Sequence, residues 1–224
     1  MHLPDPAPIL FIAANPSQTA RLRLDVEYRE IDESLRRSRY RSRFTLKPRF
    51  AVTPKDLRRA LLDEQPAMLH VSGHGFRMKR EQGILTGDAA DAGYRDLLFP
   101  EDLLADDLAR YAGGIALQDE AGNLRIVKAE TLAGLIQHFP GIRCVVLCAC
   151  HSFLQAASLH AHVPYVIGMS AAVPDDTAIA FSRALYDALG AGSSIPDAFG
   201  IAKASIPLEG LDGEDLPQLL AREA

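Results

Sequence analysis

Short apolar runs separated by helical patterns recur along the chain. The runs predict buried strands because they are continuously apolar and are bounded by Pro, Gly or Asn. We expect strands over residues 8–14, 43–52, 66–71, 142–148 and 163–169. Between them, apolar side chains recur at the spacing of an amphipathic helix. This pattern predicts helices over residues 19–39, 53–65, 128–139, 152–160, 175–189 and 195–204.

This alternation predicts the α/β class, with a doubly wound, mostly parallel sheet. Strands that are apolar throughout are buried on both faces, as in parallel sheets covered by helices. The segments 114–119 and 123–127 flank a Glu-Ala-Gly turn and predict a hairpin. Residues 76–112 are polar and irregular by pattern, although EDLLADDLARY within them is typical of a helix. We expect a single domain over residues 1–224.

Two of the predicted strands end beside a reactive side chain. His74 lies just past PAMLHV and Cys150 just past IRCVVLC, and such sheets place their chemistry at the carboxyl ends of strands. Cys150 also precedes a predicted helix, where the N-terminus favours a thiolate and offers backbone N–H groups. His74 stands between two glycines, so a substrate backbone can approach it closely. The pair predicts a Cys–His dyad, with the N–H groups of Gly75 and Cys150 as oxyanion donors.

Other interpretations of these residues stay open. A cysteine at a strand end is usually part of the core, which is our interpretation of Cys144. His74 could instead satisfy a turn, and we interpret His70 as a buried, hydrogen-bonded histidine. No metal site is expected from the cysteines and His151. On a strand rising ~3.3 Å per residue, Cys144 and Cys148 stand roughly 13 Å apart, too far to share one zinc.

Composition narrows the class of protein. The 224 residues carry a net charge of −5, which argues against nucleic-acid binding through bulk charge. No stretch approaches the ~18 apolar residues of a membrane span, and the N-terminus lacks the basic region of a signal peptide. Three cysteines within residues 144–150 are no disulfide framework, so we expect a cytoplasmic protein. The phosphate-binding motifs G-x-G-x-x-G and G-x-x-x-x-G-K-[ST] are missing, so no cofactor is expected.

Three motifs resemble the CHAT family of caspase-like cysteine peptidases: HVSGHG (70–75), GIALQDEAGNLRIV and CVVLCACHS (144–152). The resemblance continues through residues 163–199 and the opening segment from ILFIAANPSQTARLRLDVEYRE, so it covers nearly the whole chain. It implies a caspase-like three-layer α/β/α sandwich and the His–Cys dyad of caspases, separase, gingipains and clostripain-like enzymes. By this resemblance His74 is the general acid/base, Cys150 is the nucleophile, and Gly75 and Cys150 form the oxyanion hole.

The resemblance also implies substrate-binding residues. Cys148 corresponds to the residue that lines the pocket for the residue before the scissile bond, where CHAT sequences more often have Asn. Asp175 matches a pocket aspartate of separase and would favour a basic substrate residue. It is equally suited to be the N-cap of the following helix.

Residues 76–112 depart from the compact family pattern and resemble an insertion. A loop-rich segment beside an active site can gate substrate or be cut during activation. Arg77, Lys79 and Arg80 suit a cleavage target, but we favour the simpler interpretation of a solvated basic patch.

The predicted function is a cysteine endopeptidase making limited, selective cuts in protein substrates. By resemblance its setting is bacterial signalling, defence or programmed death. CHAT modules often adjoin sensor domains, so we expect a regulatory protein acting in trans. Two alternatives remain: an inactive or latent caspase-like module that binds partner proteins as a scaffold, and a small-molecule hydrolase or transferase on the same fold.

Overall fold

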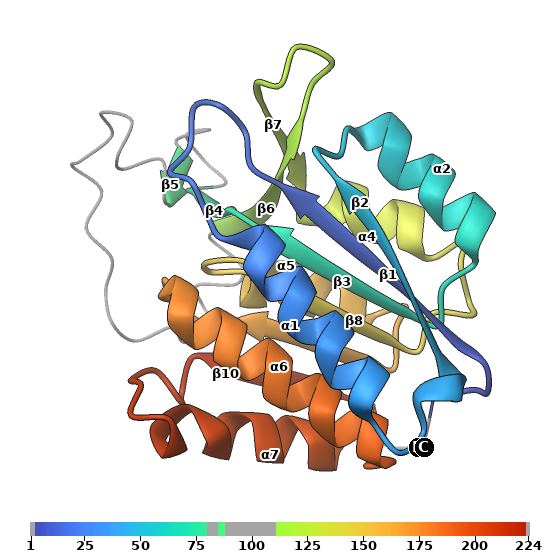
Figure 1. Cartoon of the computed structure of the whole chain (residues 1–224). Helices are drawn as coiled ribbons and strands as arrows, with labels where there is room; N and C mark the ends of the chain where they lie inside the picture. The colour runs from blue at the N-terminus through green and yellow to red at the C-terminus, as the bar shows by residue number, and fades with distance from the viewer. Residues whose placement is uncertain (1–2, 80–84, 88–110, 223–224) are drawn as a thin grey trace.

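A six-stranded sheet forms the centre of the computed structural model, which describes residues 3–79, 85–87 and 111–222. Its strand order is β10-β9-β8-β3-β1-β2 (Figure 1). The strands are β1 (Ala7–Ala14), β2 (Phe44–Phe50), β3 (Met68–Gly73), β8 (Cys144–Cys148), β9 (Tyr165–Met169) and β10 (Pro217–Ala221). Neighbouring strands are parallel except β9 and β10. The predicted mostly parallel sheet is confirmed.

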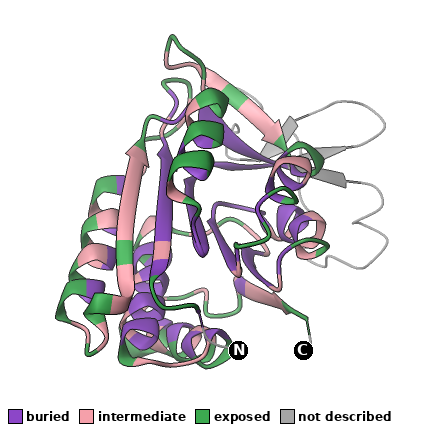
Figure 2. Ribbon diagram, turned by 90° about the vertical axis from the view of Figure 1, so that its right-hand side faces the viewer, coloured by how far each residue is buried: buried purple, intermediate pink, exposed green. Residues whose placement is uncertain are grey.

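Helices cover both faces of this sheet. One face carries α1 (Leu24–Arg37) and α6 (Asp175–Ala191), with α7 (Ile195–Leu208) packed on α6. The other face carries α2 (Pro54–Glu64), α4 (Ala129–Ile136) and α5 (Phe153–His160). Alternate residues of β1 point to opposite faces: Phe11 packs in the apolar cluster with α1 and α6, and Ile12 in the cluster with α2 and α4. Figure 2 shows the buried strands between the two layers, which confirms the three-layer sandwich.

A second, antiparallel sheet has the strand order β5-β4-β6-β7. Its strands are β4 (Gly75–Lys79), β5 (Leu85–Gly87), β6 (Tyr111–Gln118) and β7 (Leu124–Lys128). The predicted hairpin is β6–β7 and is confirmed. The expectation of an irregular segment over 76–112 was wrong at β4, at β5 and at the first residues of β6. The helical pattern of EDLLADDLARY lies outside the described residues, except for Tyr111 in β6.

Helix α1 begins later than the apolar periodicity predicts. Residues 15–23 form a loop, which we call the 15–23 loop, in place of the first turns of the predicted helix 19–39. The Asn15 side chain closes this loop, because it donates to the carbonyl of Leu22 at 3.0 Å and accepts from the amide of Leu22 at 3.3 Å. The amide of Ser17 donates to the carbonyl of Gly122 and thereby ties the loop to the β6–β7 hairpin.

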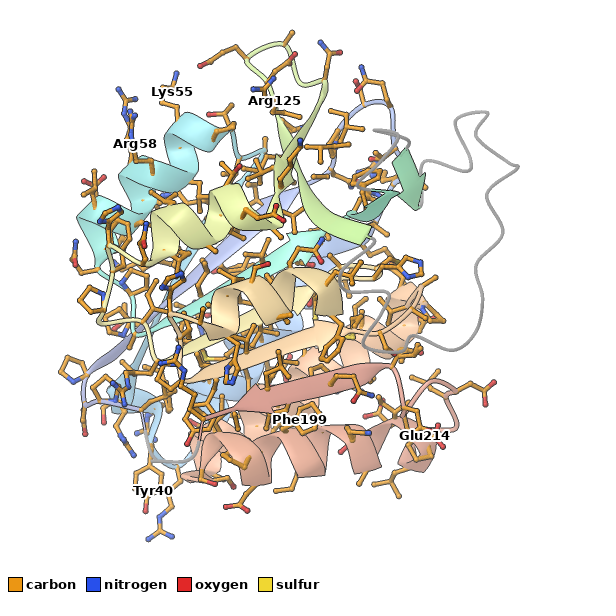
Figure 3. The ribbon with its side chains drawn as sticks, turned by 180° about the vertical axis from the view of Figure 1, so that it is seen from behind. Tyr40, Lys55, Arg58, Arg125, Phe199 and Glu214 are labelled. Carbon is orange, nitrogen blue, oxygen red and sulfur yellow. The ribbon has the colours of Figure 1, made fainter. Side chains whose placement is uncertain are left out.

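Helix α2 begins where its sequence predicts. Thr53 is the N-cap, and its side chain and the Asp56 side chain exchange hydrogen bonds with each other's backbone amides. Leu57 packs inward, whereas Lys55 and Arg58 project from the exposed side of the helix (Figure 3).

Strand β10 lies where no element was predicted. This short strand begins with a proline and pairs along the edge of the sheet with β9, so its pairing depends on a distant segment. Among the helices of the described residues, none combines the length and the apolar character that a bilayer crossing requires.

Candidate active site

His74 and Cys150 follow neighbouring parallel strands. Strands β3 and β8 pair with Ser72 opposite Cys148, and each candidate residue lies two positions further along its own chain. The carboxyl ends of β3 and β8 therefore bring His74 and Cys150 to the same edge of the sheet (Figure 1). Both side chains are largely buried, with His74 1% and Cys150 8% exposed.

The chain segments that carry the two residues touch each other directly. A Cβ atom added to Gly75 would lie 1.9 Å from the carbonyl oxygen of Cys150 and 3.1 Å from its amide nitrogen. No side chain fits in that space, so glycine is required immediately after His74. On the other side of the turn, a Cβ on Gly168 of β9 would lie 2.9 Å from the carbonyl oxygen of Ser152. The two glycines let β4 and β9 close around the cysteine turn.

Cys150 lies in a sharp turn between β8 and α5, as predicted. His151, the next residue, has a φ of 55°, a left-handed conformation that non-glycine residues rarely adopt and that clusters at functional sites. Its amide donates to the carbonyl of Ala171 at 3.0 Å. The amide of Val173 donates to the Cys150 Sγ at 3.3 Å. The segment between β9 and α6 therefore holds both the turn and the sulfur atom.

The His74 ring is oriented by a backbone carbonyl. Its Nε2 donates to the carbonyl oxygen of Ala20, in the 15–23 loop, at 2.7 Å. In a neutral imidazole only one nitrogen carries a proton, so this bond makes Nδ1 the basic nitrogen. The predicted helix 19–39 included the second half of this loop because Leu22 continues the helical periodicity of α1. The dipeptide Asn15-Pro16, which is typical of a turn, was the one local signal of a loop before α1.

The loop that holds His74 is itself attached to α6. The carboxylate of Asp175 accepts from both the amide of Arg23, at 3.1 Å, and its Nε, at 2.9 Å, and Asp176 accepts from the same guanidinium. Asp175 is the first residue of α6, and Pro174 occupies the N-cap position, so the N-cap interpretation was wrong. Its proposed contact with a basic substrate residue stays a prediction.

Cys148 is buried below this site, beside α6. Its Sγ lies 3.2 Å from Ser182 Oγ, and burial together with the nearby Glu27 carboxylate raises the pKa of its thiol well above the usual range. The thiol is therefore neutral. Cys144 is fully buried, which confirms its interpretation as core, and burial raises its pKa to about 12.

One group of metal-ligand side chains occurs among the described residues. The ligand atoms of Glu27, His70 and Cys148 lie within 4.8 Å of one another, all buried. Each of them also has a protein hydrogen-bond partner. His70 bonds to Glu27 and to Tyr186, which confirms its prediction as a buried, hydrogen-bonded histidine.

Known structures share this fold. The chain aligns with the Drosophila initiator caspase Dronc at a TM-score of 0.51 and 7% identity, covering 99% of this chain and 82% of that one. It also aligns with a secreted C11 cysteine protease from Bacteroides thetaiotaomicron, solved with an irreversible peptide inhibitor, at a TM-score of 0.50 and 11% identity. That match covers 96% of this chain and 66% of the protease. The fold is therefore that of the caspase-like cysteine peptidases.

The family follows from the sequence itself. The model of the CHAT domain matches residues 4–207, and the chain belongs to this family. No curated protein matches the sequence.

Proposed function

We propose that the protein is a cysteine endopeptidase in which Cys150 is the nucleophile and His74 the general acid/base. The Cys150 sulfur gives up its proton to His74 Nδ1 and attacks the carbonyl carbon of a substrate peptide bond. His74 then returns the proton to the leaving amine, which leaves a thioester on Cys150. Water hydrolyses the thioester, with His74 accepting a proton from the water, and the thiol is regenerated.

One observation carries this proposal. The β3–β8 register and the contact of Gly75 with the Cys150 backbone bring the histidine and the cysteine to one edge of the sheet. Support for the role of His74 comes from its bond to Ala20, because a general base is commonly oriented by a third group. In the proposal, the amides of Gly75 and Cys150 stabilise the oxyanion.

Substrate preference is part of the proposal. Asp175 selects a basic substrate residue. The carboxylate of Asp175 already binds the guanidinium group of Arg23, which supports its ability to bind an arginine of the substrate. A substrate arginine would have to displace Arg23. Cys148 is 4% exposed and bonded to Ser182, so its neutral thiol can contact the substrate only if the site opens, and it demands no charge on the substrate. The substrate is a protein cut at few sites, and a regulatory partner acting in trans remains part of the expectation.

The burial of the two side chains favours a second candidate. With His74 1% and Cys150 8% exposed, a peptide carbonyl needs a rearrangement to reach the sulfur. A latent peptidase or an inactive module that binds partner proteins fits this observation.

Cleavage of a mixed peptide library, followed by mass spectrometry, tests the proposal. Wild type is compared with Cys150→Ala and with Cys144→Ala as the matched control, since Cys144 lies in the core. The expected result is a set of cuts made by wild type and Cys144→Ala and absent from Cys150→Ala. Labelling of Cys150 by a peptide-based electrophile without cleavage would favour the latent form. Cuts that persist in Cys150→Ala would overturn the assignment of the nucleophile.

A further inference from the structure

A buried carboxylate that the proposed chemistry does not use lies between α1 and the sheet. Glu27 is 3% exposed and accepts three hydrogen bonds: from His70 Nε2 at 3.1 Å, from Ser182 Oγ at 2.7 Å, and from Ser72 Oγ. Two further contacts extend the group, between His70 Nδ1 and Tyr186 OH at 3.1 Å and between Cys148 and Ser182. The Glu27 cluster, as we call it, comprises Glu27, His70, Ser72, Cys148, Ser182 and Tyr186.

Glu27 is ionised in this setting. Burial by itself would raise the pKa of the carboxyl group, but the hydrogen bond and charge of His70 and the bonds from Ser72 and Ser182 outweigh it and lower the pKa. A buried charge persists only where its partners are held in place. The carboxylate therefore fixes the positions of the groups that donate to it.

Those groups belong to the elements that carry the candidate dyad. Ser72 and Cys148 are paired across β3 and β8, and each precedes its candidate residue, His74 or Cys150, by two positions. Because only one residue separates Ser72 from His74 and Cys148 from Cys150, the cluster lies next to the candidate dyad along both chain segments.

The helices of the cluster lead to the same site. Glu27 lies in the first turn of α1, immediately after the loop whose Ala20 carbonyl accepts from His74. Ser182 belongs to α6, which follows the Val173 amide that donates to Cys150. One carboxylate thus bonds to side chains from β3 and α6 and is joined to β8 through Ser182 and Cys148.

We infer that Glu27 is a positioning residue for the dyad: it ties the 15–23 loop, β3 and α6 together so that His74 keeps its Nε2 bond to Ala20 and faces Cys150. This inference rests on the proposed peptidase function, but its structural part concerns His74 alone. It therefore has a readout that needs no substrate.

The test compares wild type with Glu27→Gln, which keeps the shape of the side chain and removes its charge, and with Ser182→Ala. Glu33→Gln is the matched control, because Glu33 is an exposed glutamate on the same helix. Side-chain nitrogen NMR of the isotope-labelled full chain, assigned with His74→Asn, reports which nitrogen of His74 carries the proton. Spectra are recorded well below each unfolding midpoint.

We expect His74 to be protonated on Nε2 in wild type and Glu33→Gln, and to populate both tautomers in Glu27→Gln and, to a smaller extent, in Ser182→Ala. On a peptide cut by wild type, Glu27→Gln should lower kcat by about tenfold to a hundredfold with KM within about twofold, as expected for a misplaced reacting group. An unchanged His74 tautomer in Glu27→Gln would overturn the inference whatever happens to kcat.

An apolar variant separates positioning from mere stability. In Glu27→Met/His70→Phe the charge and its main partner are removed together, and Phe at position 70 keeps an aromatic ring beside Phe11, which stacks on His70 at 5.2 Å. Replacing both partners of a buried hydrogen bond by apolar groups of similar shape can be nearly neutral or stabilising. We expect this variant to unfold no earlier than Glu27→Gln and still to show the altered His74 tautomer. Recovery of the wild-type tautomer and kcat would mean that the cluster is packing only.

Two further results have a defined meaning. One equivalent of bound metal in wild type that is lost in Glu27→Gln would overturn the inference, because Glu27, His70 and Cys148 would then be ligands. Absence both of Cys150-dependent cleavage and of Cys150 labelling by the peptide-based electrophile, with the tautomer changes as expected, would refute the proposed function while leaving the positioning of His74 supported.

Discussion

The backbone of Gly75 lies so close to the carbonyl of Cys150 that a single methyl group on Gly75 would overlap it, 1.9 Å from the oxygen. This contact joins the segment after the candidate base to the candidate nucleophile. The distance between the two segments therefore depends on the lack of a side chain at Gly75.

Gly75→Ala should therefore disturb the site and the stability together. Because the clash is with backbone, which cannot rotate away, we expect a loss of about 1–3 kcal/mol in the free energy of unfolding. Urea unfolding measures this loss, and Cys150-dependent cleavage should fall with it. Gly200→Ala, where an added Cβ meets nothing within 4 Å, is the control and should stabilise α7 by about 0.5–1 kcal/mol. Equal effects of the two substitutions would contradict the close contact.

Arg23→Gln should change substrate preference more than stability. Arg23 is half-exposed, and exposed ion pairs contribute less than about 1 kcal/mol, so the unfolding free energy should change little. Releasing Asp175 from Arg23 should lower KM for an arginine-containing peptide relative to a glutamine-containing one. Asp175→Asn should abolish that difference. If Arg23→Gln leaves the ratio of the two KM values at its wild-type value, Asp175 does not contact the substrate.

The capping box of α2 predicts a dependence of stability on acid. Hydrogen bonds from the Thr53 side chain and amide lower the pKa of Asp56 below its ordinary value of 3.8. The stabilisation is therefore present above pH 3.8 and is lost as the pH falls through the lower pKa of the folded state. We expect Asp56→Asn to be less stable than wild type at pH 7, with the difference shrinking toward pH 2.

The control for the capping box is Thr53→Ala, which removes the N-cap side chain and should cost about 1 kcal/mol at neutral pH. A constant difference between wild type and Asp56→Asn across this pH range would argue against an ionised Asp56 at the cap.

The buried thiol of Cys144 predicts that stability also falls at alkaline pH. Burial raises its pKa from 9.0 to about 12 in the folded chain. The unfolded thiol ionises above pH 9 and the folded one does not, so the free energy of unfolding should decline as the pH rises from 9 to 12.

Thiol labelling at pH 8 provides the direct measurement for Cys144. Modification of Cys144, located by peptide mass spectrometry, should proceed at the rate of unfolding and accelerate with urea. Rapid labelling of Cys144 in the absence of urea would show that it is not part of the core.

The sequence predicts those parts of the site that depend on residues near one another in the chain. His74 and Cys150 were found as candidates because each follows an apolar run, and the strand–turn–helix order around Cys150 is a local signal. Their proximity also needs β3 and β8 to be neighbours, which the α/β pattern allows and the structure shows. The Ala20 carbonyl has no sequence signature, because every residue has a carbonyl group, and residues 19–23 resemble the start of a helix.

The Glu27 cluster was even less predictable from the sequence than the candidate dyad. His70 was predicted to be buried and hydrogen-bonded, yet Glu27 has the ordinary appearance of a polar residue on an amphipathic helix. Its partners come from β3 and α6, far away in the chain. A periodicity argument assigns a charged residue to solvent, whereas the fold supplies three donors that make its burial tolerable.

The sequence by itself determined the α/β class, the parallel strands and the two reactive residues at their ends, because continuous apolar runs and turn residues act over a few positions. Only the tertiary structure decided the pairing of β4 with β6, the edge strand β10, the loop that holds His74 and the partners of Glu27. These depend on hydrogen bonds between segments distant in the chain, whose energies are set by geometry in the folded state and leave no local pattern.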